Sequence, residues 1–340
     1  MAARQGAPVI GAICSAGQDG GEGGGVVTSS LTGASKWNVS FGYRYQNSFR
    51  HFRGDHEETD RLAEETQVEN NLNLFDFGLS YQINPRWSVS VSAPFMDVTR
   101  ISHRNDTVTN STGIGDMSIG AKFWLFRPPS ENHQNIQFGF SLKLPTGNPN
   151  VTAAVAPNTI NVDQSIQQGD SGTGLSLDYM AYKSIRRFTV FSAGVYLFNA
   201  KNSYAPKGWV RNGPPTPGIG YQGFSQPGTV FSVPDQYLWQ TGMGYAVPKL
   251  VGLAFTGTAR MEGVPARDLV GREDGFRRPG YGVSIAPGIM FSRSQNTWSV
   301  STPIAVHRDR TRSVPDVRNN SHGDAAFADW MMLIGYSRSF

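Results

Sequence analysis

The stretch WMMLIGYSRSF, from Trp330 to Phe340, decides the fold of this chain. Counting back from Phe340 in steps of two gives a mostly bulky, apolar set: Arg338, Tyr336, Ile334, Met332 and Trp330. Successive side chains of a strand point to opposite faces, so this period of two predicts a β-strand. A closed membrane barrel pairs its last strand with its first and places aromatic rings at the membrane interface, so the stretch favours such a barrel. An edge strand of a soluble β-protein is the alternative.

The same alternation runs through the rest of the sequence. Near the start, the bulky residues Trp37, Val39, Phe41, Tyr43 and Tyr45 alternate with Asn38, Ser40, Gly42, Arg44 and Gln46. About twelve such strands are predicted, at residues 37–46, 75–83, 87–95, 113–126, 136–144, 175–182, 191–197, 237–245, 251–261, 281–291, 298–306 and 330–340. The longer connections between them are predicted at residues 47–70, 97–112, 145–171, 198–235, 263–278 and 307–324.

These connections alternate between short and long along the chain. Short periplasmic turns on one rim and long extracellular loops on the other are typical of outer-membrane barrels. Small polar and charged residues occupy the second face of nearly every predicted strand, which indicates a wet lumen rather than the packed core of a soluble sandwich. The sequence therefore predicts an all-β, transmembrane, antiparallel up-and-down barrel of about twelve strands in the bacterial outer membrane.

Aromatic residues fall at the predicted strand ends, where the interfacial girdles of a membrane barrel belong. One group marks the short-turn rim: Trp37, Tyr81, Trp87, Phe291, Trp298 and Phe340. A second group lies toward the long-loop rim: Tyr45, Phe75, Phe95 and Trp239. Two girdles are therefore expected.

The composition excludes several other classes of protein. The chain has 340 residues, and no apolar run approaches the roughly 18 residues of a membrane-spanning helix. Its net charge is +4, but the basic residues are scattered, so a nucleic-acid surface is not expected. Cys14 is the only cysteine, which excludes an intramolecular disulfide and a cysteine-based metal cage. The histidines have no metal-ligand spacing, and no cofactor is implied.

Two segments are predicted along the chain. Residues 1–35 form a flexible, Gly- and Ser-rich lead-in, and residues 36–340 form the outer-membrane barrel. Within the lead-in, the short apolar run from Ala7 to Cys14 is typical of the tail of a secretory signal peptide. We therefore expect a remnant of a signal peptide in this segment.

Eight charged residues are predicted to face the lumen and to line a pore. They are Arg44, Asp76, Asp116, Lys122, Lys143, Asp178, Arg260 and Glu262. Both signs are present in equal number, so two interpretations stay open. The charges either set the field that a passing solute experiences, or they pair with one another and fill a narrow lumen. The glycines that flank Asp116 favour a structural role for this residue, at a bulge or a close backbone approach.

An enzyme is a further alternative. The segment from Asn320 to Asp324 and the nearby His307 contain the residue types of a nucleophile, a base and an orienting acid. Neighbours in sequence need not have the geometry that a nucleophile and its base require. We therefore expect no catalytic residue in this chain.

Several glycine-containing motifs resemble a known family. GIGD at residues 113–116, followed by GAKF at 120–123 and LKLPTG at 142–147, is similar to the strand and loop-entrance motifs of bacterial outer-membrane transporters named for the meta-pathway of phenol degradation. The resemblance covers most of residues 37–340. It implies a barrel that is linked to the uptake of aromatic or other hydrophobic compounds.

The last strand also resembles the C-terminal assembly signal of bacterial outer-membrane proteins. That signal ends in Phe, as this chain does at Phe340, although Arg338 stands where an apolar residue is common. The resemblance implies that the barrel-assembly machinery is a partner of this strand.

We therefore predict an outer-membrane channel for the passive uptake of small molecules, with aromatic or hydrophobic compounds as the implied class. One rival is a closed barrel whose extracellular loops bind a partner or a surface. The other is an outer-membrane hydrolase. The expected partners are outer-membrane lipid and the solute itself.

Overall fold

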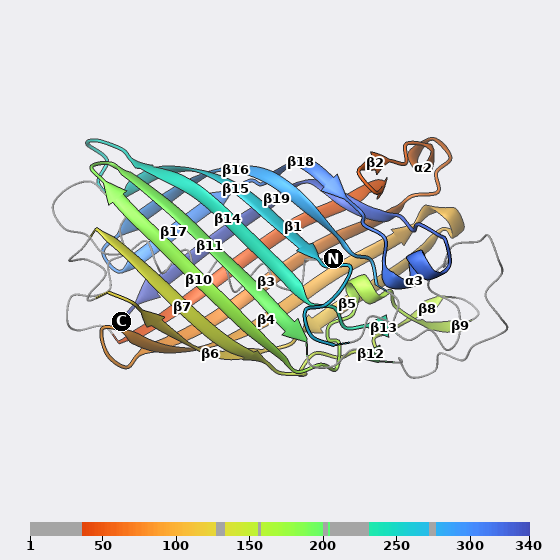
Figure 1. Ribbon diagram of the computed structural model, residues 1–340, viewed down its shortest axis with the longest axis horizontal. Helices are drawn as coiled ribbons and strands as arrows, with labels where there is room; N and C mark the ends of the chain where they lie inside the picture. The colour runs from red at the N-terminus through yellow and green to blue at the C-terminus, as the bar shows by residue number, and fades with distance from the viewer. Residues whose placement is uncertain (1–35, 127–132, 156–157, 200–202, 205–230, 272–276) are drawn as a thin grey trace.

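The computed structural model describes residues 36–126, 133–155, 158–199, 203–204, 231–271 and 277–340. The lead-in of residues 1–35, with its signal-like run, lies outside the described residues. The described chain winds into a closed barrel of 12 antiparallel strands, which confirms the predicted fold class (Figure 1). Within the described residues, no helix is long and apolar enough to cross a membrane.

Each strand of the wall pairs with the next one along the chain. The wall consists of β1 (Trp37–Arg53), β3 (Val68–Gln82), β4 (Trp87–Ser102), β5 (Thr107–Ile114) with β6 (Ser118–Trp124), β7 (Gln134–Lys143), β10 (Gly174–Ile185), β11 (Phe188–Asn199), β14 (Gln236–Ala246), β15 (Leu253–Val264), β16 (Gly280–Arg293), β17 (Asn296–Ser301) with β18 (Ile304–Asp309), and β19 (Ala325–Ser339). The last strand β19 pairs with β1 along its length, from Asn38 opposite Ser339 to Phe52 opposite Ala325. This seam closes the barrel, as the final stretch of the sequence predicts.

Shorter elements lie at the long-loop end of the barrel (Figure 1). They are β2 (His56–Glu57), α2 (Asp60–Ala63), η2 (His103–Asn105), β8 (Thr152–Val155), β9 (Asn158–Asn161), η4 (Gln164–Ile166), β12 (Ser203–Tyr204), β13 (Phe231–Ser232) and α3 (Val314–Arg318). The opposite end carries the short turns and the end of β19.

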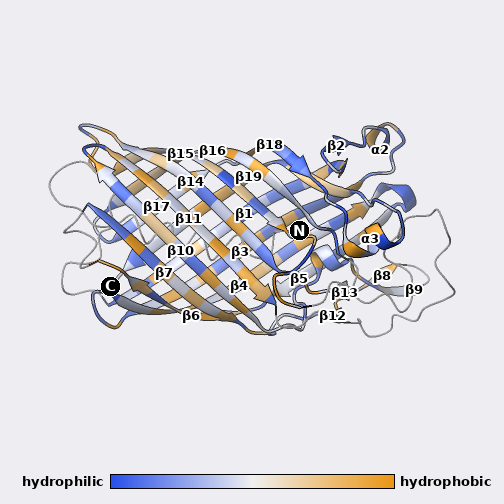
Figure 2. Cartoon of the chain, in the orientation of Figure 1, coloured by the Kyte–Doolittle hydropathy of each residue, from blue (hydrophilic) through white to orange (hydrophobic). Residues whose placement is uncertain are grey.

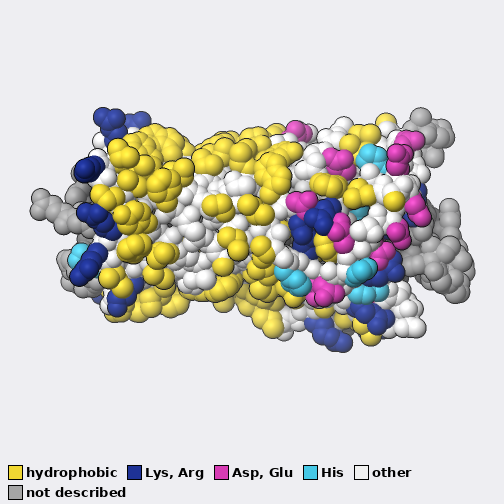
Figure 3. All heavy atoms as spheres, turned by 90° about the horizontal axis from the view of Figure 1, so that it is seen from above, with side chains coloured by type: hydrophobic (Ala, Val, Ile, Leu, Met, Phe, Trp, Pro, Cys, Tyr) yellow, Lys and Arg dark blue, Asp and Glu magenta, His cyan; other side chains and the backbone are white. Residues whose placement is uncertain are grey.

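The alternation of each strand produces an apolar outer surface (Figures 2 and 3). Exposed side chains on this surface include Val39, Phe77, Leu79, Val91, Phe140, Leu177, Val190, Phe255, Ile289 and Val300. A soluble protein buries side chains of this kind, whereas a barrel presents them to lipid. The outer surface is therefore the membrane-facing one.

Aromatic rings of neighbouring strands contact each other at the short-turn rim. The pairs there are Trp37–Tyr81 at 4.7 Å between centroids, Trp87–Phe123 at 4.8 Å, Phe188–Tyr245 at 5.0 Å and Phe291–Trp298 at 5.8 Å. Toward the other rim, Tyr45 and Trp330 lie 5.7 Å apart. These rings form girdles at the two depths where the barrel meets the headgroup regions.

The short turns are fixed by local chemistry. The side-chain oxygen of Asn84 accepts the backbone N–H groups of Arg86 at 2.9 Å and Trp87 at 3.0 Å, which closes the turn between β3 and β4. The two-residue turn between β16 and β17 contains Ser294 at φ +54°, the left-handed conformation that suits the twist of a hairpin.

The strands beside the first two long loops extend further than predicted. β1 continues to Arg53 and β3 begins at Val68, so only β2, α2 and short connections remain of the predicted loop at 47–70. The predicted loop at 97–112 is mostly a hairpin, because β4 continues to Ser102 and β5 begins at Thr107. These extensions rise beyond the lipid-facing belt, so polar side chains replace the apolar alternation that marks a strand in the sequence.

Two predicted strands are each split into two segments. The strand predicted at 113–126 is interrupted between β5 and β6, where Gly115, Asp116 and Met117 leave the ladder. The strand predicted at 298–306 is interrupted at Thr302 and Pro303, since proline has no N–H to donate to the ladder.

Candidate functional site

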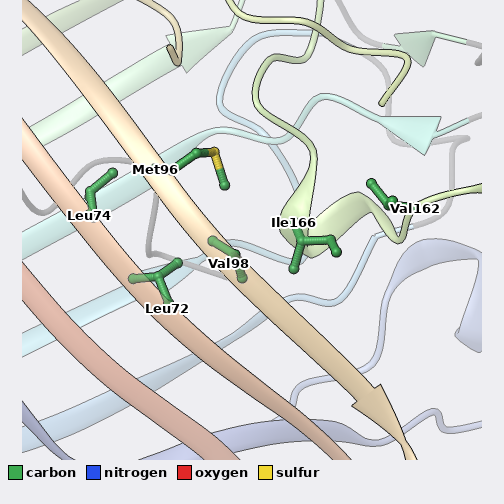
Figure 4. Close-up of a cluster of buried hydrophobic side chains, with 6 residues drawn as sticks. All are labelled: Leu72, Leu74, Met96, Val98, Val162 and Ile166. Carbon is green, nitrogen blue, oxygen red and sulfur yellow. The ribbon is translucent and has the colours of Figure 1, made fainter. Parts of the chain in front are cut away.

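Part of the connection from β7 to β10, described at residues 144–155 and 158–173, folds back into the lumen. We call it the inward loop. Its Val162 and Ile166 are almost completely buried against lumen-facing side chains of β3 and β4 (Figure 4). Those side chains are Leu72, Leu74, Met96 and Val98. Burial of an aliphatic side chain contributes about 1.5–3 kcal/mol, so this apolar cluster holds the loop inside the barrel.

A buried ion pair fixes the two ends of the inward loop to the wall. The ammonium group of Lys143 lies 2.6 Å from both carboxylate oxygens of Asp170 and 3.6 Å from a carboxylate oxygen of Asp116. The other oxygen of Asp116 accepts the backbone N–H of Gly147 at 2.9 Å. Asp116 therefore joins the break between β5 and β6 to the entrance of the loop.

The entering and leaving segments of the inward loop lie in direct contact. The N–H of Gly169 donates to the carbonyl of Asn148 at 3.1 Å. A Cβ atom on Gly169 would lie 2.3 Å from the carbonyl oxygen of Gly147, so only glycine fits there. The loop consequently leaves and re-enters the wall at one point.

The far end of the inward loop is held by a second ion cluster. The carboxylate of Asp163 lies 3.3 Å from Arg100 of β4 and 3.0 Å from Arg278, and it also accepts the N–H of Ser165 at 2.8 Å. Burial acts to raise the pKa of Asp163, but attraction to Arg100 and Arg278 outweighs it and holds the pKa well below 3.8, the usual value. The carboxylate is therefore charged at neutral pH.

This pKa predicts how the inward loop responds to acid. A carboxyl group whose pKa is lower in the folded protein stabilises the fold above its unfolded pKa, and that stabilisation is lost as the pH falls through the folded value. If the reconstituted barrel conducts ions, we expect its conductance to stay constant from neutral pH down to about pH 4 and to rise only in stronger acid. Conductance recorded against pH tests this expectation. The Asp163→Asn variant should show the raised conductance already at neutral pH. A rise of the wild-type conductance near pH 6 would contradict the expectation.

A third ion cluster joins two distant parts of the wall. Glu262 of β15 accepts hydrogen bonds from Arg44 of β1 at 2.6 and 3.2 Å and from Arg260 at 2.6 Å. Arg44 and Arg260 are only 1% and 2% exposed, so the cluster is withdrawn from water. Gln46 and Gln240 supply further oxygen atoms to the two guanidinium groups. Two cations thus share one carboxylate inside the lumen.

A cavity of about 160 Å³, lined mainly by lumen-facing residues, lies between the inward loop and the short-turn rim. Its wall is rich in serine: Ser40, Ser80, Ser90, Ser92, Ser118, Ser141 and Ser176. Five of the predicted charges line it: the paired Asp116 and Lys143, and also Asp76, Lys122 and Asp178. Within the part of the chain that the structure describes, Asp76, Lys122 and Asp178 form no ion pair; Asp76 accepts a hydrogen bond from Ser92 at 2.6 Å. The cavity therefore offers small hydroxyl groups and uncompensated charge to a solute.

The eight predicted lumen charges thus fall into two classes. Arg44, Arg260 and Glu262 pair with one another, and Lys143 and Asp116 pair at the loop entrance. Asp76, Lys122 and Asp178 line the cavity without an ion pair among the described residues. Pairing between lumen charges is therefore observed for the first group, and the role of the second group in solute passage stays a prediction.

Sequence reasoning missed the residues that narrow the lumen. Asp163, Asp170, Val162 and Ile166 all lie in a stretch that was predicted only as a long loop, at 145–171. A signal was present in Leu72, Leu74, Met96 and Val98, which occupy the inward phase of their strands. Apolar side chains in an otherwise polar lumen require a cover, and the inward loop supplies it.

The geometry of the loop histidines does not match a hydrolase. The Nε2 atom of His322 lies 2.7 Å from the carbonyl of Arg310, and the hydroxyl of Ser321 donates to the carbonyl of Asp316. His51 and Asp324 form a close pair at 2.8 Å, but Nε2 of His51 accepts the backbone N–H of Val68 at 2.9 Å. In the described ranges, no group of His, Cys, Asp and Glu could hold a metal ion.

Comparison with known proteins supports the architecture. No protein-family model and no curated sequence matches the chain. The COG4313 outer membrane channel from Pseudomonas putida F1 is 14% identical with a TM-score of 0.58, over 90% of this chain and 96% of that one. The β domain of the Bordetella autotransporter BrkA (11% identity, TM-score 0.48, 90% and 100% coverage) and the CymD monoaromatic hydrocarbon channel (12%, 0.39, 90% and 89%) are more distant. The first likeness shows that the fold is that of an outer-membrane barrel.

Proposed function

We propose that this protein is a passive outer-membrane channel for small solutes. The observation that carries the proposal is the serine-lined cavity with Asp76, Lys122 and Asp178 on its wall. A barrel that serves only as a scaffold needs no such charges, since burying a charge without a partner is costly. In this proposal the solute passes the inward loop and then crosses the cavity toward the short-turn rim.

Aromatic or other hydrophobic compounds of small size are the proposed solutes. The resemblance of the motifs at 113–123 and 142–147 to transporters of the phenol meta-pathway supports this class. So does the cavity, because about 160 Å³ is close to the roughly 150 Å³ of an engineered protein cavity that holds benzene. The apolar side chains of Leu74, Met96 and Met180 on the cavity wall provide contacts for a ring, and the serines provide hydrogen bonds for its hydroxyl or carboxylate groups.

Single-channel recording tests the proposal. The protein is refolded in detergent, inserted into a planar bilayer, and recorded with and without a small aromatic acid such as benzoate. Discrete openings that the aromatic acid interrupts are the expected result. A barrel that inserts, shows a heat-dependent shift on a gel and passes no current would support the rival, a closed barrel whose loops bind a partner.

Ion preference gives a residue-level prediction. Lys122→Gln leaves Asp76 and Asp178 as the uncompensated charges of the cavity, so the ratio of cation to anion permeability should rise severalfold. Asp178→Asn should change the ratio in the opposite direction. The reversal potential in a salt gradient measures both.

The matched control is Lys183→Gln, which removes the same charge from the lipid-facing side of β10. It should leave the reversal potential unchanged. An equal shift in Lys122→Gln and Lys183→Gln would show that the ions do not pass Lys122.

A further inference from the structure

The short-turn rim is basic around its described circumference. Its basic residues are Lys36, Arg86, Lys183, Arg186, Arg187, Lys249, Arg293 and Arg338. All but Arg86 are exposed. Among the described residues, every Asp and Glu belongs to the lumen or to the long-loop end, so none neutralises this rim. Figure 3 shows the result as a group of Lys and Arg side chains beyond the apolar belt, with no acidic side chain among them on that face.

Three of these cations point toward lipid and not toward the periplasm. Lys183 occupies the same outward phase of β10 as Leu177 and Ile185, and Arg293 follows Phe291 in the outward phase of β16. Arg338 lies on the outer face of β19, with its guanidinium 4.9 Å from the ring centre of Phe340. Each of them therefore stands at the aromatic girdle, where the phosphate groups of a bilayer lie.

These three cations have no acidic partner within the described part of the chain. The long-loop rim is different, because cations there pair with carboxylates, as Arg53 does with Glu58 at 3.1 Å and Arg310 with Asp316 at 3.2 Å. The asymmetry leaves one rim with an uncompensated positive field at headgroup depth.

We propose that the short-turn rim binds the anionic headgroups of phospholipids in the periplasmic leaflet, such as phosphatidylglycerol or cardiolipin. Lys and Arg side chains extend along the apolar surface and place their charge at the phosphate level. Arg338 and Lys183 would each contact a phosphate, and the turn residues Arg186, Arg187 and Lys249 would extend the same surface. A soluble acidic partner would engage the turn residues but has no reason to require lipid-facing ones.

Fluorescence quenching by brominated lipid tests this proposal. Trp37, Trp87 and Trp298 lie in the short-turn girdle and serve as native reporters. The protein is reconstituted in phosphatidylcholine bilayers. An increasing fraction of the lipid is then replaced by brominated phosphatidylglycerol or by brominated phosphatidylcholine, and the quenching of tryptophan fluorescence is compared. We expect a stronger association with phosphatidylglycerol. Each surface cation contributes roughly a fivefold preference for anionic lipid. The preference of the triple variant Lys183→Gln, Arg293→Gln, Arg338→Gln for phosphatidylglycerol should therefore be at least about tenfold lower than that of the wild type.

The matched control removes the same charge from the long-loop end, by Arg104→Gln, Arg267→Gln and Arg318→Gln. It should keep the preference of the wild type. A wild type with no preference, or an equal loss in both triple variants, would overturn the proposal. If the rim triple variant does not fold, the three single variants are compared instead, and each should lower the preference. Channel conductance is recorded separately, so a failure of the transport proposal leaves this result interpretable.

Discussion

Excising the inward loop is expected to raise single-channel conductance severalfold. Val162, Ile166 and the β8–β9 hairpin belong to the segment that covers the lumen-facing wall of β3 and β4, so their removal widens the conducting path. The geometry allows a clean excision. The N–H of Gly169 already donates to the carbonyl of Asn148, so a two-residue Asn-Gly turn can replace residues 149–168.

The matched control for the excision is removal of α2 (Asp60–Ala63), a segment of the long-loop end with no buried residue. Its removal should leave the conductance unchanged. The point variant Asp170→Asn, which removes the closer of the two carboxylates beside Lys143, should give a smaller increase than the excision. If the excised barrel conducts like the wild type, the inward loop is not the narrowest part of the path.

The largest effect on stability is expected for Glu262→Gln. This change leaves Arg44 and Arg260 buried without an anion, and loss of one partner from a buried ion pair costs about 3–5 kcal/mol. Urea unfolding of the barrel in lipid vesicles, followed by tryptophan fluorescence, measures the free energy of unfolding. A loss below about 1 kcal/mol would show that water reaches the cluster.

The matched control for this variant is Glu58→Gln. Glu58 pairs with Arg53 at the partly exposed long-loop end, where an ion pair contributes about 0–1 kcal/mol. The two variants remove the same carboxylate charge, so the difference between them isolates the effect of burial.

The sequence predicts the wall of the barrel well because lipid imposes a regular pattern on it. Each membrane-facing position must be apolar, and each neighbour in sequence must face the lumen, so Trp37 to Tyr45 and Trp330 to Phe340 already show the strands and the seam between them. Prediction fails where this constraint ends. Val68 and Ser102 begin and end strands that have left the membrane, and their polar neighbours resemble a loop.

The site is less predictable because it is built from contacts between distant segments. Strand phase is enough to place Arg44, Lys122 and Glu262 on the lumen side. It does not show that Glu262 reaches Arg44 across several strands, or that Asp170 returns to Lys143 from a loop. Those pairings depend on the curvature of the wall and the path of the inward loop. Neither the curvature nor the path of the loop produces a periodic pattern in the sequence.

The seam between β1 and β19 also has a consequence for the order of folding. Asn38 donates to the hydroxyl of Ser339, a contact between residues 301 positions apart. Contacts of such large separation form slowly, because a long chain must lose its freedom before the pairing stabilises it. Until β19 arrives, β1 on one side and β17 with β18 on the other expose unpaired edges that can template association with other chains. The ring is thus completed late, and nascent chains need protection from aggregation during the interval before closure.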